Sequence, residues 1–235
     1  GYHFGRHRRA AVSLPQQGAA HLCVATPVRT SPGRPSVART LPRTARKPQS
    51  EACCMLKDMQ RALAHEALSV LSPYGFVLAG SGAIREHGLI ERPTEDIDLF
   101  CAVRAEDNQF ETAVTIATKH LEECGYHIRE HQRSPHYFSA EVEREGVTLQ
   151  FDMGIDYREY PPARLEVGPV LDVRDAVANK LGAMCSRGEP RDYLDADKIH
   201  TSGLFSDETL LSLTLDHDLG LTKSLFIECL RAVVT

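Results

Sequence analysis

One feature of the sequence constrains the possible fold of this chain more than any other. It is a glycine–serine turn followed by two aspartates that are separated by a single residue. Leu78-Ala-Gly-Ser-Gly82 has the pattern of a short apolar strand that ends in a turn opening a helix, and Asp96-Ile-Asp-Leu-Phe100 has the pattern of a second strand. Residues two apart on a strand point to the same face of the sheet. Asp96 and Asp98 should therefore stand together, and two such carboxylates repel each other unless a cation lies between them.

Magnesium suits this pair, because it takes hard oxygen ligands and binds one or two carboxylates together with substrate phosphates. The backbone N–H groups of the Gly80-Ser81 turn, at the start of a helix, suit a phosphate group. The sequence contains neither a Walker lysine motif nor a Rossmann glycine pattern nor a nucleophile elbow. The turn and the two aspartates together predict metal-dependent nucleotide chemistry, with Gly80 and Ser81 as nucleotide-binding residues.

Hydrophobic spacing predicts the elements around this corner. Helices are expected over 56–71, 81–86, 106–124, 172–187, 207–215 and 221–233, with a further helix starting at Pro190. Strands are expected over 75–79, 96–103, 126–130, 137–142 and 147–152, and a loop over 153–163. The predicted fold class is α/β (α+β), with a mixed-sheet half over 55–165 and a helical half over 166–235.

A second group of charged residues lies downstream, in Lys180-Leu-Gly-Ala-Met-Cys-Ser-Arg187 and Arg191-Asp-Tyr-Leu-Asp195. Positions 180 and 187 share one face of an ideal helix, whereas a proline interrupts the helix before Arg191. Lysine and arginine suit phosphate oxygens, although a solvated helix face would give the same pattern. Asp192 and Asp195 fit either a functional site or a set of caps and ion pairs that joins two helices.

The two motifs together resemble the signature of the polymerase-β-like nucleotidyltransferases, in the form found in the AbiEii-type toxin branch that includes the mycobacterial MenT toxins. In that form an arginine and a serine or threonine precede the two aspartates, and here these are Arg92 and Thr94. The resemblance spans roughly residues 55–200. It implies a nucleotidyltransferase fold completed by the helical C-terminal half.

The resemblance also implies roles for single residues. Asp152 would be the third carboxylate, completing a site for two Mg²⁺ ions with Asp96 and Asp98 and taking the proton of the attacking hydroxyl. A strand-end carboxylate facing water is the alternative for Asp152. Lys180 and Asp192 are further catalytic candidates, and the residues expected to bind the nucleotide are Gly80, Ser81, Arg92, Lys180, Arg187 and Arg191.

The implied activity is transfer of nucleotides from an NTP, with CTP favoured, to the 3′ acceptor end of tRNA, with release of pyrophosphate. This would block aminoacylation and translation, as expected of a toxin with a cognate antitoxin. The antitoxin could be a kinase acting on Thr94, where a phosphate would add about −1.5 to −2 charge beside the aspartates. The alternative for Thr94 is a residue that supports the turn before the strand. The alternatives for the whole protein are an aminoglycoside-type nucleotidyltransferase and a non-catalytic binding module of the same fold.

The charge of the chain is divided unevenly, with +8 over residues 1–54 and −13 over residues 55–235. An acidic body does not attract nucleic acid over long range, so RNA contact requires a local basic patch. No apolar run approaches the roughly 18 residues that span a bilayer. The seven cysteines show no paired spacing, which predicts reduced thiols and a cytoplasmic protein.

Residues 1–54 are rich in Pro, Arg, Ser and Thr and show no sustained hydrophobic period, which predicts a disordered segment. Three interpretations compete: a basic arm that touches RNA, an Arg-rich transit peptide, or sequence upstream of the functional protein. We favour the third, with Met55 as the natural start, because the family resemblance begins just after it.

Overall fold

The computed structural model describes residues 49–94, 96–102 and 107–231 of the chain. These residues belong to one compact unit. The expectations for residues 1–48 lie outside this part of the chain. Helix α1 (Gln49–Leu71) begins before Met55, so the prediction of disorder is wrong for residues 49–54.

The centre of the fold is a seven-stranded mixed sheet in the order β3-β4-β5-β2-β1-β7-β6. β2 pairs with β5, and β1 with β7, in parallel, whereas the other neighbours are antiparallel. This arrangement confirms the predicted α/β class. The strands are β1 (Phe76–Leu78), β2 (Asp96–Cys101), β3 (His127–Ser134), β4 (Tyr137–Arg144), β5 (Val147–Ile155), β6 (Ala163–Leu165) and β7 (Gly168–Val170).

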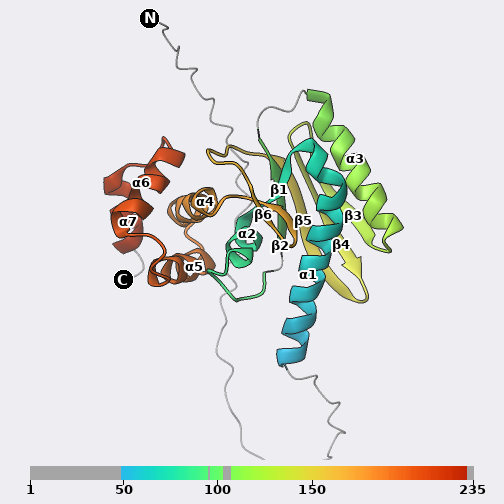
Figure 1. The fold of residues 1–235 in the computed structure, drawn as a ribbon, viewed down its shortest axis with the longest axis horizontal. Helices are drawn as coiled ribbons and strands as arrows, with labels where there is room; N and C mark the ends of the chain where they lie inside the picture. Colours follow the sequence, from blue (N-terminus) through green and yellow to red (C-terminus); the bar gives the residue numbers. More distant parts are fainter. Residues whose placement is uncertain (1–48, 95, 103–106, 232–235) are drawn as a thin grey trace, which may run out of the picture. The chain divides into compact units, whose positions relative to one another are not determined.

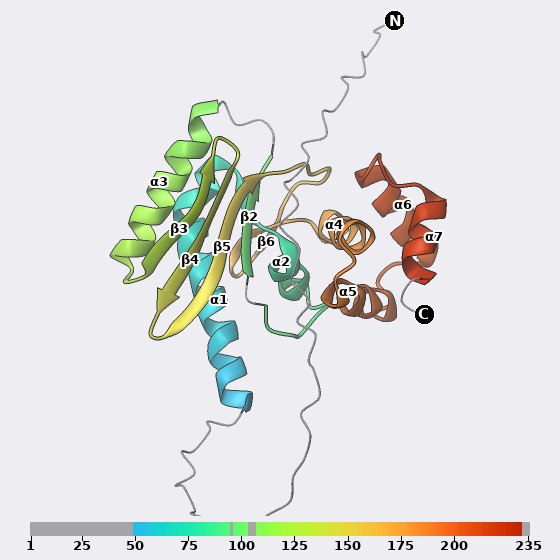
Figure 2. The ribbon, with the colours of Figure 1, turned by 180° about the vertical axis from the view of Figure 1, so that it is seen from behind.

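One face of this sheet is apolar because hydrophobic residues alternate with polar ones along its central strands. In β2, Ile97 and Leu99 are fully buried, whereas Asp96 and Asp98 are partly exposed on the other face. Helices α1 and α3 (Asp107–Glu123) cover the apolar face, and Figure 2 shows both of them behind the sheet. The part of the core beneath α1 and α3 is therefore on the side of the sheet away from the aspartates, and buried apolar residues of the helices that follow β1 and β7 continue the core beyond it.

The remaining helices begin on the aspartate side with one beside β2, and the last two of them lie farthest from the sheet (Figure 1). α2 (Gly80–Glu86) follows β1 directly, and α4 (Val173–Ser186) packs against it. Asp172 caps α4 by accepting a hydrogen bond from the backbone N–H of Arg174. α5 (Pro190–Thr201) starts at the predicted proline and is followed by α6 (Asp207–His217) and α7 (Lys223–Arg231).

The largest differences from the sequence prediction lie in the strands. β3 extends to Ser134 and β5 to Ile155, so part of the predicted 153–163 loop belongs to the sheet. The sequence pattern does not predict the hairpin of β6 and β7. β7 has three residues and joins the sheet through pairing of Val170 with Leu78. A strand this short is not predicted by the hydrophobic spacing of its own residues. The predicted boundary at 165/166 falls within this hairpin.

In the part of the chain that the structure describes, every helix is too short or too polar to cross a bilayer. Four cysteines with described side chains are free thiols: Cys101, Cys124, Cys185 and Cys229.

Candidate active site

Three aspartates share the polar face of the two central parallel strands. Asp98 on β2 is directly opposite Asp152 on β5, and Asp96 is opposite Gln150. Directly opposed residues place their side chains on the same face of a sheet. The structure therefore brings Asp96, Asp98 and Asp152 to one surface, the arrangement expected from the sequence.

Gly80 fits closely against one of these carboxylates. Its φ is +54°, and a Cβ atom at this position would lie 1.8 Å from Oδ2 of Asp98. The preceding residue, Ala79, donates its backbone N–H to the carbonyl of Asp98 over 2.8 Å. The turn between β1 and α2 therefore needs glycine both for its backbone conformation and for the approach of the Asp98 side chain.

The crowding of carboxylates changes the acidity of Asp98. Burial, together with the charges of Asp152 and Asp96, raises the pKa of Asp98 to about 7, although Lys180 and Arg187 act in the opposite direction. Like charges held together in this way favour either a shared proton or a bound cation. The oxygen donors also match the ligand preference of Mg²⁺. In both respects the residues fit a magnesium site.

The side chains of the three aspartates are not arranged as a complete metal-coordination site in this structure. Among the described residues, no group of three or more His, Cys, Asp and Glu side chains has an arrangement that could hold a metal ion. Asp96 is ion-paired with Arg191, whose Nη1 lies 3.2 Å from its Oδ2. Asp152 accepts a hydrogen bond of 3.1 Å from Nε2 of Gln150. Metal binding at all three aspartates would therefore require side-chain movement, above all at Asp96.

A buried set of ion pairs joins the Gly80-Ser81 turn to α4 and α5. Lys180 is only 5% exposed, and its Nζ contacts Asp192 at 3.2 Å and Asp195 at 3.1 Å. The same ammonium group donates a hydrogen bond of 3.0 Å to Oγ of Ser81. These three contacts use the donor capacity of the ammonium group, so in this state Lys180 holds Ser81 and α5 in place.

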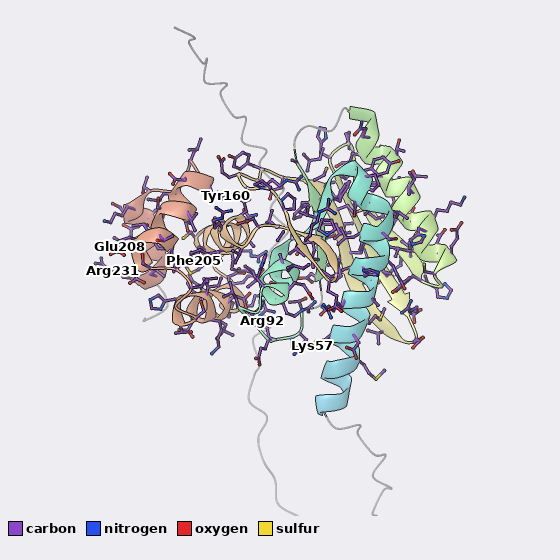
Figure 3. The ribbon with its side chains drawn as sticks, in the orientation of Figure 1. Lys57, Arg92, Tyr160, Phe205, Glu208 and Arg231 are labelled. Atoms are coloured by element: carbon purple, nitrogen blue, oxygen red, sulfur yellow. The ribbon has the colours of Figure 1, made fainter. Side chains whose placement is uncertain are left out.

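Two arginines complete this set. Arg187 donates two hydrogen bonds to Asp192, of 2.7 and 2.8 Å, and Arg92 donates two to Asp195, of 2.7 and 2.6 Å. Arg92 also reaches Oγ of Ser81 at 3.3 Å, and it is labelled in Figure 3. Burial by itself raises the pKa of Asp192, but the hydrogen bonds from Arg187 and the charge of Lys180 hold it below its usual value.

Thr94 lies just before β2 and is 3% exposed. Its Oγ1 accepts a hydrogen bond of 2.8 Å from Nε2 of Gln60 and donates one of 3.3 Å to the carbonyl of Asp96. Arg85 on α2 donates in turn to Oε1 of Gln60. Thr94 therefore links α1 and α2 to the start of β2, and a kinase could reach its hydroxyl only after local opening of this loop.

All the residues expected at the site thus lie in one connected region, together with residues that the sequence analysis missed. Gln60 and Gln150 position Thr94 and Asp152 respectively, and neither belongs to a motif. Gln60 did carry a signal, because it lies one helical turn before Ala64 on the buried stripe of α1. A polar residue on such a stripe needs a buried partner. Gln150, on a half-exposed strand, gave no comparable sign.

Comparison with known proteins identifies a family whose model matches this sequence. The family model for the nucleotidyl transferase AbiEii toxin of type IV toxin–antitoxin systems matches residues 61–232, more than half of the chain. No curated protein matches the sequence at a significant level.

Solved structures with a detectable likeness include a candidate nucleotidyltransferase from H. pylori. It has 16% sequence identity and a TM-score of 0.44, with 78% of this chain and 99% of that chain covered. JHP933 from Helicobacter pylori has 16% identity and a TM-score of 0.40, with 80% and 97% of the two chains covered. TM-scores this low carry no inference about the site.

Proposed function

The chain belongs to the AbiEii nucleotidyl transferase toxin family of type IV toxin–antitoxin systems, and we propose that it transfers nucleotides from an NTP to the 3′ acceptor end of tRNA. CTP is the proposed donor. A tRNA blocked at this end could not be aminoacylated, so translation would stop. The family implies a cognate antitoxin as a partner. We propose tRNA as a second partner, in the role of substrate.

The observation that carries the proposal is the opposition of Asp98 and Asp152 beside Gly80, next to a cluster of lysine and arginine side chains. The site contains anionic oxygens suited to a divalent cation. It also contains guanidinium groups that are accessible to phosphate, because Arg187 and Arg191 remain partly exposed in their ion pairs. A metal–triphosphate complex has the charge distribution that such a site would receive.

Magnesium would be held by Asp96, Asp98 and Asp152, and two bound ions would supply charge neutralisation of the triphosphate and activation of the acceptor hydroxyl. Asp152 would accept the proton of that hydroxyl, and Gln150 fixes its orientation. The hydroxyl oxygen forms a bond to the α-phosphorus while the bond from that phosphorus to pyrophosphate breaks. Arg187, Arg191 and Arg92 would stabilise the charge that grows on the pyrophosphate.

Lys180 has a different place in this proposal. Any contact of its ammonium group with a phosphate would have to replace one of its contacts with Ser81, Asp192 or Asp195. Its proposed contribution is therefore to keep the turn and α5 at the correct distance from the aspartates. Asp192 acts in the same way, by orienting Arg187.

The proposed control by phosphorylation concerns Thr94. A phosphate on this side chain would not fit the buried hydrogen bonds to Gln60 and Asp96, and its charge would repel the neighbouring carboxylates. Modification by a kinase antitoxin would therefore trap the loop before β2 in an open, inactive form.

Incubation of the protein with each labelled NTP, magnesium and total tRNA, followed by a denaturing gel, tests the activity. Labelled tRNA should appear with the wild type, and Asp98→Asn and Asp152→Asn should reduce the rate by about 10³-fold or more. A parallel arm with aminoglycosides tests a small-molecule acceptor, which the charge of −13 over residues 55–235 would favour. Labelled aminoglycoside without labelled tRNA would refute the tRNA proposal.

A further inference from the structure

The side chain of Arg191, at the start of α5, forms an ion pair with Asp96. Its Nη1 lies 3.2 Å from Oδ2 of Asp96, and its Nε lies 2.7 Å from Oε2 of Glu189. We propose that Arg191 is an exchangeable counterion, which neutralises Asp96 in the free protein and transfers to the triphosphate when a metal–nucleotide complex binds. This inference rests on the proposed function, because it takes Asp96 as a metal ligand.

The contact of Arg191 differs from those of the neighbouring cations. Arg92 and Arg187 each make two short hydrogen bonds to Asp195 and Asp192, carboxylates that are 1% and 0% exposed. Arg191 makes one longer contact to Asp96, and the two side chains are 44% and 36% exposed. Exposed ion pairs contribute only about 0–1 kcal/mol. The pair of Arg191 and Asp96 is therefore the one suited to repeated opening.

The backbone on either side of Arg191 is fixed, so only its side chain needs to move. Pro190 occupies the first turn of α5, and the N–H of Asp192 donates to the carbonyl of Glu189 over 2.9 Å. The side chain of Asp192 is held by Lys180 and Arg187. Rotation about the side-chain bonds of Arg191 can move its guanidinium group by several ångströms without disturbing this anchor.

The competition for Asp96 makes the binding of metal depend on nucleotide. A divalent cation at this carboxylate would repel the guanidinium group and replace it. When the metal ion binds without nucleotide, Arg191 loses its ion pair with Asp96 and gains no new anionic partner in exchange. With a metal–triphosphate complex it gains phosphate oxygens, which suit the planar guanidinium group. Arg191 therefore disfavours the metal by itself and favours the complex, and such coupling is reciprocal between the two ligands.

The test is a titration with Mn²⁺, followed by electron paramagnetic resonance, with and without a non-hydrolysable α,β-methylene NTP analogue. The proteins are the wild type, Arg191→Ala, Arg191→Lys and Asp96→Asn. Lys119→Ala is the matched control, since it removes an exposed positive charge from α3 on the opposite face of the sheet. Binding is measured without turnover, so the readout does not depend on activity.

Arg191→Ala should bind Mn²⁺ alone about fivefold more tightly than the wild type, the gain expected from removing an exposed competitor. The same variant should bind the analogue in the presence of Mn²⁺ about tenfold more weakly. Arg191→Lys, which keeps the charge, should lie between the wild type and Arg191→Ala in both measurements. Lys119→Ala should behave as the wild type. Opposite signs for metal and nucleotide would not arise from a merely structural role of Arg191.

Two other results would overturn the inference and are distinguishable. If Asp96→Asn loses Mn²⁺ but Arg191→Ala binds it no more tightly than the wild type, Arg191 is not the competitor, and the proposed metal site stands. If Asp96→Asn binds Mn²⁺ as the wild type does, Asp96 is not a ligand, and the proposed function fails together with the inference.

Discussion

Asp98 on β2 and Asp152 on β5 are register partners in the parallel pair at the centre of the sheet. Their carboxylates are therefore held together by backbone hydrogen bonding and not by any attraction of their own. The helices on this side bring positive charge toward them, through Lys180 and Arg187. The sheet thus positions the carboxylates of the site, and the positive side chains in the segment from α4 to α5 partly offset their negative charge.

The first prediction concerns the stability of the metal-free protein as a function of pH. The pKa of Asp98 is about 7 in the folded protein and 3.8 for the unperturbed group. The folded state therefore binds this proton more tightly than the unfolded state. The stability that the proton contributes is fully present below about pH 3.8 and is lost as the pH rises through about 7, with a slope of about 1.4 kcal/mol per pH unit.

Asp98→Asn does not titrate, so in chelator its free energy of unfolding relative to the wild type should rise between pH 5 and pH 8. The expected rise is on the order of 2 kcal/mol, measured by urea unfolding at each pH. Asp197→Asn, which removes an exposed carboxylate from α5, is the matched control. A constant difference across this range would mean that Asp98 is ionised throughout.

The second prediction concerns the contact of Gly80 with Asp98. Gly80→Ala should abolish nucleotide transfer and lower the free energy of unfolding by about 2 kcal/mol or more, because the new methyl group displaces the Asp98 carboxylate and the backbone is strained. Gly125→Ala is the matched control. Its φ is +85° and nothing lies within 4 Å of a Cβ there, so it should cost only about 1 kcal/mol of backbone strain and leave transfer unchanged. Equal effects of the two substitutions would assign the Gly80 phenotype to backbone strain alone.

The third prediction concerns the buried cation between Asp192 and Asp195. Lys180→Met should lower the free energy of unfolding by about 3 kcal/mol, because two buried carboxylates lose their shared partner. Lys198→Met, at an exposed position of α5, should change it by less than about 0.5 kcal/mol. Chemical denaturation of both variants provides the comparison, and a small effect at Lys180 would show that Arg92 and Arg187 suffice to neutralise the pair.

The fourth prediction concerns the hydroxyl of Thr94. Thr94→Val should cost about 1–3 kcal/mol, because the amide of Gln60 loses its buried acceptor. Thr94→Ser keeps the hydroxyl and should recover most of this loss, whereas Thr115→Val on the exposed side of α3 should have little effect. Thermal unfolding of the three variants tests the prediction. If Thr94→Ser were as unstable as Thr94→Val, the methyl group and not the hydrogen bond would stabilise the loop.

The part of the site that depends on short sequence spacing could be predicted. Asp96 and Asp98 lie two residues apart on one strand, so their shared face follows from strand geometry. Gly80 follows an apolar strand, which indicates a sharp turn. Pro190 fixes the start of α5. Each of these conclusions needs only a few neighbouring residues.

The parts that depend on tertiary pairing could not be predicted in the same way. The binding of a triphosphate by Lys180 stays a prediction, and the sequence did not assign to this lysine its contacts with Asp192 and Asp195, which exist because α5 packs against α4. The sequence predicts that β5 ends at Asp152 and that a loop rich in Pro, Tyr and Asp follows over 153–163, whereas the strand continues to Ile155. In the fold, Gly154 is within the strand, where a Cβ would come within 2.7 Å of the Phe100 ring.

The two aspartates of α5 have a practical consequence for anyone who wishes to divide this protein. Asp192 and Asp195 bind one lysine and two arginines that come from two separate stretches of chain, namely Arg92 before β2, and Lys180 and Arg187 in α4 and at its C-cap. A version shortened before α5, or a chimera that takes this helix from another protein, would remove the two carboxylates that neutralise the buried Lys180 and the partly exposed Arg92 and Arg187. The minimal transferable piece therefore runs from the first helix at least to Thr201.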